Sequence, residues 1–406
     1  MGKLIYCGPF YSSSEEGDTL TLARGSLNNA PNQFQLALIS GLMQCEECRE
    51  MILVNALPIG AWPGKSAEIV LPDKEWKTGN YQAYEIGCIN LPIFKQKGRE
   101  KRLYRLLESI VEDGDSILLY SCYLPFMKAI KRLKKHVQFT LIVTDLPEYY
   151  DLGKTSLIRK MMRRIICSEV YQAMERVDSF VLITEQMCNP LHVGVRPYVV
   201  LEGIWNGIPP AVQNCIKKQD AKRIVFYSGT LHYRYGIQLL LDAFGKIERE
   251  NYELWICGAG EAAADIEKLS ERDLRIKYFG FCSSTSVAEL RKRATVLVNP
   301  RPPEGEYTKY SFPSKTIEYM ASGIPMVAFK LEGIPDEYDH YVNYVPGNSA
   351  EALKCRIVEI CEDQTGKYME KATSGSQYIQ QYKNPATQAE KVVAMMSDCM
   401  NMGNRR

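Results

Sequence analysis

Short apolar segments rich in β-branched residues alternate along this chain with longer segments in which apolar residues recur every three or four positions. This alternation is typical of βαβ units, in which parallel strands form a sheet covered by helices. Ligands of such sheets bind beyond the carboxyl ends of the strands, so the loops after the strands should carry the functional residues. We expect strands at Leu4–Cys7, Met51–Asn55, Ile86–Asn90, Ser116–Ser121, Phe139–Thr144 and Phe180–Thr184, and then at Arg223–Ser228, Tyr252–Cys257, Arg275–Phe279, Thr295–Asn299, Met326–Phe329 and Tyr341–Val345.

The two series of strands are separated by Pro197–Gln219, a segment rich in glycine and proline that is typical of an interdomain linker. A chain of 406 residues also exceeds the length at which one hydrophobic core keeps growing. We therefore expect two parallel-sheet domains, residues 1–203 and 204–384, facing each other across a cleft. The apolar spacing after Pro385 predicts a helix over 385–406, which we expect to pack back on the first domain.

Composition narrows the class of protein. The chain is 46% hydrophobic and 24% charged, which is ordinary for a globular protein, and it has no apolar segment of bilayer-spanning length. Its start lacks the pattern of a secretory signal, and its 13 cysteines are scattered as in reduced proteins. We therefore expect a cytoplasmic protein. The pair Cys45 and Cys48 has no second pair or nearby histidine to complete a zinc site, so an ordinary helix end is expected there.

Charge is unevenly distributed although the formal net charge is only +2. Between Lys95 and Arg164, 16 Lys or Arg residues stand against 8 Asp or Glu residues, an excess of 16 − 8 = 8. This basic region is most often a solvated surface, but it also suits anionic lipid, a phosphorylated acceptor or nucleic acid. We expect no nucleic-acid partner.

One segment in the second half carries specific chemistry, Tyr310–Gly323, with the sequence YSFPSKTIEYMASG. It predicts a helix with Ser311 and Ser314 as caps of its first turn and Gly323 as its stop. The free N–H groups of such a helix start bind anions, and Lys315 adds a charge in the first turn. A diphosphate is the ligand that suits this end, and Glu318 lies one turn further on, where its carboxylate can accept hydrogen bonds from ribose hydroxyls.

The segment KYSFPSKTIEYMASGIPMVAF, followed by EGIPDEY, resembles the donor-binding core of retaining glycosyltransferases of glycosyltransferase family 4. Companion segments occur in the family's order, namely DSFVLITEQM, FYSGTLHYRYGIQLLLDAF, LWICGAGE, YFGF and LVNPR. The resemblance covers about residues 178–345 and is weak before them. It implies an α/β fold of GT-B architecture, with two Rossmann-like doubly wound parallel-sheet domains.

The resemblance also implies a donor site, in which Glu318 binds the ribose and the backbone of Ser311–Lys315 contacts the diphosphate. Two departures from the family pattern stand out. Tyr310 replaces the first of two glutamates, and Thr230 and Tyr235 replace the Arg and Lys that usually hold the diphosphate, so Arg234, Lys315 and Arg301 become the candidate cations. The candidate donor-binding residues are Gly229, Thr230, Arg234, Gly258, Gly260, Phe279, Gly280, Arg301, Tyr310, Ser311, Phe312, Ser314, Lys315 and Glu318.

In the first domain, Asp145 follows a predicted strand, where the family often places a polar residue beside the reacting centre. It is our candidate catalytic residue, which would orient or deprotonate the acceptor hydroxyl, although a helix cap or salt bridge is an equal alternative. The loop Gly8–Asn32 corresponds to one that approaches donor phosphate and acceptor in the family. Its small or polar candidates are Gly25, Asn28, Asn29 and Asn32.

A segment near the middle of the chain predicts a strongly amphipathic helix with a basic polar side, suited to an anionic membrane surface. We slightly favour the alternative that its apolar side packs on the sheet and its basic side faces solvent. Its apolar residues are Leu157, Ile158, Met161, Met162, Ile165 and Ile166, with Arg159, Lys160, Arg163 and Arg164 between them.

These features together favour a nucleotide-sugar-dependent glycosyltransferase of the hexosyltransferase type, acting with retention in cell-surface polysaccharide or glycolipid synthesis. The expected partners are a nucleotide-sugar donor of the UDP or GDP type and a saccharide or lipid-linked acceptor, at the inner face of the cytoplasmic membrane. No metal or further cofactor is implied. Two alternatives stay open, a catalytically silent scaffold partner of an active transferase and a sugar-nucleotide epimerase.

Overall fold

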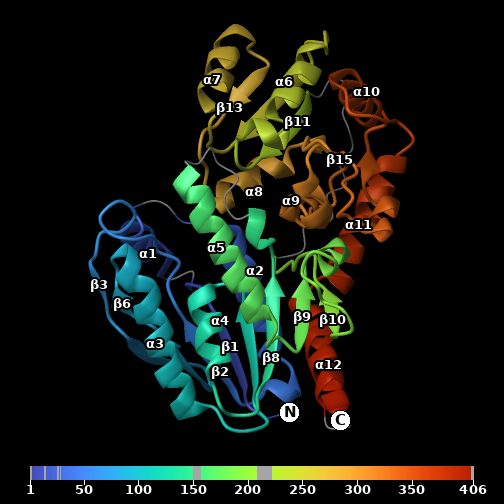
Figure 1. Cartoon of the computed structure of the whole chain (residues 1–406). Coiled ribbons are helices and arrows are strands. Elements are labelled where there is room, and N and C mark those ends of the chain that lie inside the picture. Colours follow the sequence, from blue (N-terminus) through green and yellow to red (C-terminus); the bar gives the residue numbers. More distant parts are fainter. Residues whose placement is uncertain are drawn as a thin grey trace. The chain divides into compact units, whose positions relative to one another are not determined.

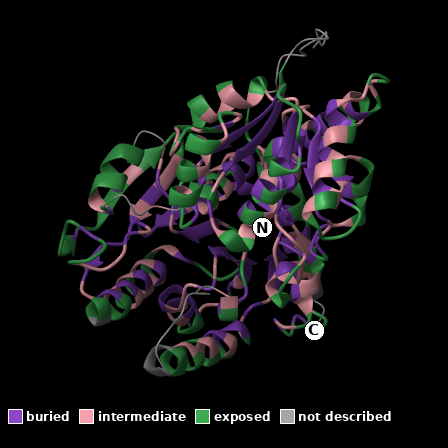
Figure 2. Ribbon diagram, turned by 90° about the horizontal axis from the view of Figure 1, so that it is seen from above, coloured by how far each residue is buried: buried purple, intermediate pink, exposed green. Residues whose placement is uncertain are grey.

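The computed structural model of this chain describes residues 2–12, 15–24, 27, 29–149, 157–207 and 222–403. The chain divides into two compact units, of which unit 1 comprises Met1–Asn206 with Asn384–Arg406 and unit 2 comprises Gly207–Lys383. Each unit is built around its own sheet (Figure 1). Buried strands lie inside the units, and the outward faces of the helices are exposed (Figure 2).

Unit 1 contains a sheet in the order β10-β9-β8-β7-β1-β2-β5-β4, together with a small antiparallel sheet of β3 and β6. All neighbours in the large sheet are parallel except β4, which pairs antiparallel with β5 at the edge. The strands are β1 (Leu4–Gly8), β2 (Met51–Asn55), β3 (Val70–Leu71), β4 (Lys74–Thr78), β5 (Tyr81–Glu85), β6 (Cys88–Ile89), β7 (Ser116–Tyr120), β8 (Gln138–Val143), β9 (Ser179–Leu182) and β10 (Tyr198–Val200).

Helices cover both faces of this sheet. Three of them, α3, α4 and α5, lie side by side on one face, and α2 packs with the C-terminal helix α12 on the other (Figure 1). Proline suits the start of a helix, and α3 and α4 both begin with one in the first two positions. The helices are α1 (Glu16–Leu22), α2 (Asn29–Leu42), α3 (Pro92–Ile110), α4 (Leu124–Lys131), α5 (Leu157–Met174) and α12 (Pro385–Gly403).

Unit 2 contains a sheet in the order β13-β12-β11-β14-β15-β16, in which all pairings are parallel. Its core is formed by residues of the inner strands β12, β11, β14 and β15 with α6, α7 and α10. The strands are β11 (Arg223–Ser228), β12 (Tyr252–Cys257), β13 (Ile276–Tyr278), β14 (Val296–Asn299), β15 (Met326–Ala328) and β16 (Asn343–Tyr344). The helices are α6 (Ile237–Gly245), α7 (Ala263–Arg272), α8 (Ser284–Lys292), α9 (Ser314–Ala321), α10 (Ala350–Cys361) and α11 (Lys367–Tyr382).

Three expectations about the strands are wrong. The strand expected at Ile86–Asn90 is reduced to β6, and the sheet position belongs to β5, whose sequence YQAYE alternates polar and buried residues rather than forming an apolar run. The edge strand β4 makes the large sheet of unit 1 mixed rather than parallel. The segment from Pro197 onward is not a linker at its start, because β10 pairs there with β9.

The contact between α2 and α12 depends on a glycine. A Cβ added at Gly41 would lie 2.0 Å from the carbonyl oxygen of Pro385, the first residue of α12. Beyond that contact, α12 buries Val392 and Met396 against the sheet side of unit 1. The absent side chain at residue 41 therefore sets how closely these two helices approach.

We predict that Gly41→Ala destabilises the protein by about 1–2 kcal/mol, because overpacking at a close helix contact forces the backbone to shift. Urea unfolding of the full chain measures this change. The matched control is Gly17→Ala in α1, where nothing lies within 4 Å of the added Cβ. That variant should be neutral or gain up to about 1 kcal/mol from helix propensity. Equal stability of Gly41→Ala and wild type would contradict the prediction.

Candidate functional site

The carboxyl ends of the strands in unit 2 lie at one edge of the sheet, because all of them are parallel. Gly229 directly follows β11 and Gly258 directly follows β12, and Gly280 comes two residues after the last residue of β13. Backbone hydrogen bonds join these loops, from the N–H of Gly229 to the Cys257 carbonyl at 2.9 Å and from the N–H of Gly258 to the Gly280 carbonyl at 2.7 Å. The sheet edge therefore presents a continuous surface of glycine backbone.

Lys315 reaches this surface from the first turn of α9. A Cβ added at Gly229 would lie 2.0 Å from the Nζ atom of Lys315, and the φ of Gly229 is +143°. The Lys315 amine also lies 5.3 Å from the ring centroid of Tyr227, on β11. The neighbouring loop is equally close, since a Cβ at Gly258 would lie 1.9 Å from the carbonyl oxygen of Gly229. Only glycine at residue 229 leaves room for the lysine amine.

The charge of Arg301 acts on Lys315, and that of Arg234 acts on Arg301, and we call Arg234, Arg301 and Lys315 the cation cluster. Arg301, which comes after β14, lies over two tyrosine rings. Its Cζ atom is 5.6 Å from the ring centroid of Tyr235 and 5.0 Å from that of Tyr307. The guanidinium of Arg234 also lies over the ring of Tyr235, with its Cζ atom 5.1 Å from the ring centroid. Among the residues that the structure describes, none of the three cations forms an ion pair within 4.0 Å.

Burial makes this concentration of charge costly. It lowers the pKa of Lys315, which the carboxylate of Glu318 raises and the charge of Arg301 lowers further. It also lowers the pKa of Arg301, whose Nε atom is buried without a hydrogen-bond partner among the described residues. Cations that are half-buried and lack a carboxylate partner are what an anionic ligand can compensate.

The start of α9 adds backbone donors to the cations. Pro313 is its N-cap residue, and no side chain caps this helix in the described part of the chain. The expectation that Ser311 and Ser314 cap the helix is therefore wrong. The Ser311 hydroxyl instead accepts a hydrogen bond from Arg301 at 2.8 Å, and Ser314 is the first helical residue. The N–H of Thr316 donates to the Pro313 carbonyl at 2.8 Å, so among the described residues the N–H groups of Ser314 and Lys315 are those that stay available to a ligand.

The rest of the expected donor-binding segment divides into exposed and inward-facing residues. Glu318 is exposed on α9, and Tyr310 is half-buried at the end of a 3-10 helix, Glu306–Tyr310. The ring of Phe312 is buried against Tyr338 at 5.2 Å, so only its backbone faces the helix start. Gly323 ends the helix as expected, with φ +68° and its N–H donating to the Met320 carbonyl at 3.1 Å.

The loops after β12 and β13 carry the candidate donor-binding residues Gly258, Gly260, Phe279 and Gly280. Gly260 has φ +158°, and a Cβ there would lie 2.5 Å from the Leu231 carbonyl oxygen. Phe279 packs edge-on against Trp255 at 5.5 Å. Phe281 is 86% exposed, so a planar aromatic ligand can reach its ring. Thr230 is also exposed, and its carbonyl accepts a hydrogen bond from Tyr227 at 2.9 Å.

Sequence reasoning missed the aromatic residues that hold the cations. The ring of Tyr235 contacts both Arg234 and Arg301, the ring of Tyr307 contacts Arg301 as well, and the ring of Tyr227 contacts Lys315. Tyrosines are frequent in this chain, which has 25 of them, so no local pattern distinguishes these from core residues. Only the fold shows that they meet the cations.

In unit 1, Asp145 is exposed just beyond β8. Asn32 is buried, and its amide bonds the backbone of Tyr11 in both directions, at 2.9 and 3.0 Å. Asn29 begins α2, whereas Gly25 and Asn28 lie outside the described residues. The loop expected at Gly8–Asn32 contains the helix α1.

The cysteine pair follows the end of α2. Burial raises the pKa of the Cys45 thiol and raises that of Cys48 to about 12. Raised thiol pKa values disfavour the thiolate that redox and metal chemistry need. In the described part of the chain, no group of His, Cys, Asp and Glu side chains is arranged to hold a metal ion, and no helix there is long and apolar enough to cross a membrane.

The basic helix α5 contradicts the packing that we favoured. Four of its apolar residues are exposed, namely Met161 at 60%, Met162 at 55%, Ile165 at 54% and Ile166 at 48%. The helix is buried near its C-terminal end, through residues such as Val170 and Met174. The side chains of 157–159 lie outside the described residues. As far as its side chains are described, the first half of this helix therefore exposes an apolar side.

Comparison with known proteins relates this geometry to a class. Residues 222–363 match the family model described as Glycosyl transferases group 1. Over 190 residues the chain is 26% identical to an uncharacterized glycosyltransferase of Methanocaldococcus jannaschii. That alignment covers 43% of this chain and 46% of the relative, so the chain spans less than half the length of the curated relative that it matches.

Solved structures show the same fold over the whole chain. Sucrose-phosphate synthase from Thermosynechococcus elongatus is 15% identical, with a TM-score of 0.65 and coverage of 98% of this chain and 100% of that one. Anabaena HepE in complex with UDP is 12% identical, with a TM-score of 0.63 and the same coverage. HepE has also been solved in complex with UDP-glucose. The fold of this chain is therefore GT-B-like, with two Rossmann-like units, and unit 2 matches a group 1 glycosyltransferase domain.

We predict that Lys315→Met raises the free energy of unfolding by about 1 kcal/mol, because it removes a desolvated cation. The penalty is fully present below the folded-state pKa and disappears as pH rises from that pKa to the unfolded one, since burial holds the folded-state pKa below the unfolded value. The same variant should lose most of the stabilisation that pyrophosphate gives to the wild type.

Urea unfolding at pH 7, with and without pyrophosphate, measures both effects. The matched control is Lys292→Met, which removes a lysine that is 54% exposed in α8 and pairs with Glu289. This control should change neither quantity. A less stable Lys315→Met protein, or one with an undiminished pyrophosphate effect, would show that Lys315 is a structural residue.

Proposed function

We propose that this protein is a glycosyltransferase that moves a sugar from a nucleotide-sugar donor to an acceptor. The observation that carries the proposal is the approach of Lys315 to Gly229, which brings a cation, a free helix start and glycine backbone to one sheet edge. A diphosphate suits this edge because its oxygens accept hydrogen bonds and carry charge. The match of unit 2 to group 1 glycosyltransferases supports the same function.

The site residues have distinct roles in this proposal. The backbone at the start of α9 and Lys315 hold the diphosphate, and Arg301 and Arg234 supply further positive charge. Glu318, exposed one turn along α9, accepts hydrogen bonds from the ribose. Gly258, Gly260 and the Phe279–Phe281 loop receive the base. UDP is the first nucleotide to test, because HepE has been solved with UDP and with UDP-glucose.

Charge stabilisation is the main contribution of the cation cluster to the reaction. As the sugar leaves, negative charge grows on the diphosphate, and preorganised cations and N–H groups stabilise it. We propose transfer with retention, as in glycosyltransferase family 4, in which the leaving diphosphate helps to deprotonate the acceptor on the same face. Asp145 would then orient the acceptor hydroxyl.

The presence of the cation cluster favours an active enzyme over a silent scaffold. The scaffold alternative rested on the replacement of the usual diphosphate cations by Thr230 and Tyr235. Tyr235 now lies between Arg234 and Arg301, and Lys315 lies beside Gly229, so positive charge is supplied from other loops. Arg301 and Lys315 are half-buried and form no ion pair in the described part of the chain, and such cations are costly to keep in a protein that binds no anion.

We predict that Glu318→Ala weakens UDP binding at least tenfold. We also predict that Asp145→Asn lowers turnover and leaves UDP binding unchanged. The first loses charge-assisted hydrogen bonds to the ribose, and the second leaves the donor site of unit 2 intact. Calorimetry with UDP and donor consumption detected by mass spectrometry measure the two effects. Both residues are exposed, so both variants should fold.

The control for this experiment is Glu271→Ala, an exposed glutamate in α7, which should bind UDP like the wild type. An unchanged dissociation constant in Glu318→Ala would remove the ribose assignment. Reduced UDP binding in Asp145→Asn would instead place Asp145 in donor binding. Epimerised donor without any glycosylated product would favour the epimerase alternative.

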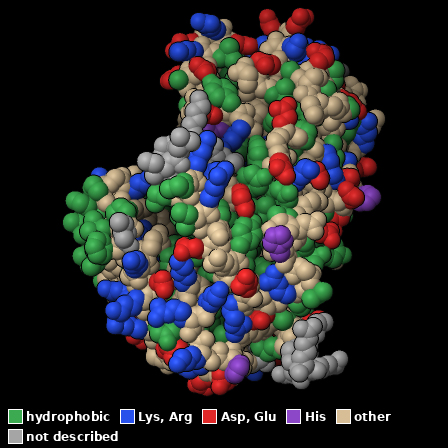
Figure 3. Space-filling view, in the orientation of Figure 1, with side chains coloured by type: hydrophobic (Ala, Val, Ile, Leu, Met, Phe, Trp, Pro, Cys, Tyr) green, Lys and Arg blue, Asp and Glu red, His purple; other side chains and the backbone are tan. Residues whose placement is uncertain are grey.

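We further propose that the acceptor is reached at an anionic membrane surface, through α5. The exposed apolar residues Met161, Met162, Ile165 and Ile166 lie beside Lys160 and Arg164, which are exposed as well. Lys and Arg side chains also gather over α3 and α4 in the same unit (Figure 3). An apolar stripe with basic neighbours matches the interface of an anionic bilayer, as a lipid-linked acceptor in cell-surface polysaccharide or glycolipid synthesis would require.

We predict that the wild type co-sediments with vesicles containing anionic lipid and that Ile165→Glu reduces the bound fraction at least fivefold, because it places a carboxylate in the apolar stripe. Leu274→Glu is the control, since Leu274 is a single apolar residue, 76% exposed, in unit 2. Binding that does not depend on anionic lipid, or that Ile165→Glu leaves unchanged, would exclude α5 as the membrane contact.

A further inference from the structure

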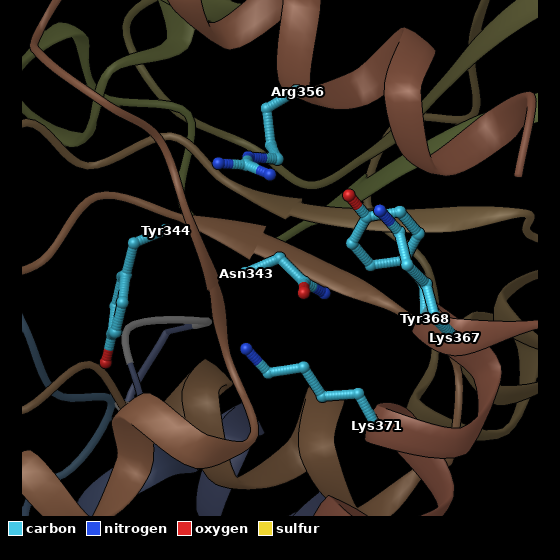
Figure 4. Close-up of a pocket in the computed structure, with 6 residues that line it drawn as sticks. All are labelled: Asn343, Tyr344, Arg356, Lys367, Tyr368 and Lys371. Carbon is cyan, nitrogen blue, oxygen red and sulfur yellow. The ribbon is translucent and has the colours of Figure 1, made fainter.

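A second concentration of positive charge surrounds a cavity in unit 2, away from the cation cluster. The cavity has a volume of 270 Å³ and lies between the short strand β16, the helix α10 and the first turns of α11. Side chains from all three elements turn into it (Figure 4). The lining residues are Asn343, Tyr344, Arg356, Lys367, Tyr368 and Lys371.

The cavity lies beside the amino end of β16, whereas the donor site lies beyond the carboxyl ends of the strands. The amine of Lys371 donates a hydrogen bond at 2.9 Å to the carbonyl of Val342, which immediately precedes β16. The donor site follows the carboxyl ends of β11, β12 and β14, and all strands of the sheet run in the same direction. A ligand in the cavity would therefore not occupy the donor site.

Three of the six lining residues are cations, and none is a carboxylate. Carboxylates act on this lining from outside it. Asp339 acts on Lys371 and Tyr344 and pairs with Lys330, and Glu359 is shared by several lining residues. The carboxylate oxygens of Glu359 lie 2.8 Å from Arg356 and 3.6 Å from Lys367, and this carboxylate also accepts a hydrogen bond from the Tyr368 hydroxyl. Lys371 forms no ion pair within 4.0 Å among the described residues. Of the three lining cations, Arg356 and Lys367 thus share one carboxylate, and Lys371 is left without an ion pair in the described part of the chain.

Lys371 and Arg356 have hydrogen-bond donors left for a ligand. Burial lowers the pKa of Lys371, the charge of Arg356 lowers it further, and Asp339 opposes both. The Val342 carbonyl uses one of the three donors of a lysine amine. The Nε atom of Arg356 is buried without a hydrogen-bond partner among the described residues. In Figure 4 the guanidinium of Arg356 and the amine of Lys371 enter the cavity from opposite sides.

The ligand that suits this cavity accepts several hydrogen bonds and carries negative charge. A phosphoryl group does both, because its oxygens accept charge-assisted hydrogen bonds from lysine and arginine. The cavity volume of 270 Å³ corresponds to roughly nine water molecules of liquid volume, so there is space for a small organic group beside the phosphate. The Tyr368 ring, with Lys367 at 4.6 Å from its centroid, offers an apolar wall for such a group.

We propose that this cavity is a second anion site, which binds the phosphoryl group of inorganic phosphate or of a small phosphate ester. Arg356 and Lys371 contact its oxygens, and Lys367 supplies charge at the mouth. The site is independent of the nucleotide-sugar donor.

Calorimetric titration of the full chain with phosphate at constant ionic strength tests the proposal. The titration is run in a Lys315→Gln background, so that the cation cluster loses its lysine. In this background we expect phosphate binding to persist, and Lys371→Gln to raise its dissociation constant about tenfold, as the loss of one charge-assisted contact would. The matched control, Lys354→Gln, removes an equal charge from α10 outside the lining, where Lys354 pairs with Glu351. It should bind phosphate like its parent.

Two outcomes would overturn the proposal. One is loss of all phosphate binding in Lys315→Gln alone, and the other is equal binding with and without Lys371→Gln. If Lys371→Gln does not fold, Lys367→Gln takes its place, because the Lys367 side chain is 60% exposed. The Lys371→Gln variant with Lys315 intact should bind UDP like the wild type. UDP binding therefore tests the donor site separately from the cavity.

A comparison of ligands identifies the source of the phosphoryl group. Tighter binding of glycerol 3-phosphate than of inorganic phosphate, with no binding of glycerol, assigns the cavity to a phosphate ester. Tighter binding of inorganic phosphate assigns it to the free anion. Binding of neither at millimolar concentration would contradict the proposal.

Discussion

The amine of Lys315 lies where the side chain of residue 229 would be, since a Cβ there would come within 2.0 Å of its Nζ atom. This close approach is possible only because Gly229 has no side chain and takes φ +143°. It brings the first turn of α9 against the end of β11, and the neighbouring glycine loops after β12 and β13 complete the surface. The arrangement of the proposed donor site thus depends on a missing side chain as much as on the charged one that uses its space.

The charge held at this site is costly without a ligand. Lys315 and Arg301 are desolvated, and their mutual repulsion adds to the lowering of the pKa of Lys315. Tyrosine rings reduce that cost, because Tyr235 and Tyr307 flank the guanidinium of Arg301. The chain therefore stabilises cations through aromatic faces and leaves their hydrogen-bond donors for an anion. Active sites commonly hold such unfavourable groups, which a bound substrate then compensates.

The sequence predicted the strands that carry the site more accurately than those of unit 1. The strands β11 and β12 have the expected bounds, because they are buried on both faces and so form continuous apolar segments. The strand β5 alternates polar and buried residues beside an antiparallel edge, and its apolar pattern was too weak to recognise. The helix start and Lys315 were predicted from local chemistry. The contacts of Arg301 with Ser311 and two tyrosines join residues from separate loops, which no local pattern reveals.

A crystal structure of the protein with UDP tests the central claim most directly. The account predicts that the diphosphate lies at the start of α9, with its oxygens about 3 Å from the Lys315 amine and from backbone N–H groups of the first turn. It also predicts that the ribose lies within reach of Glu318. A diphosphate bound elsewhere in unit 2, with the Lys315 amine still against Gly229 and free of phosphate, would contradict the account.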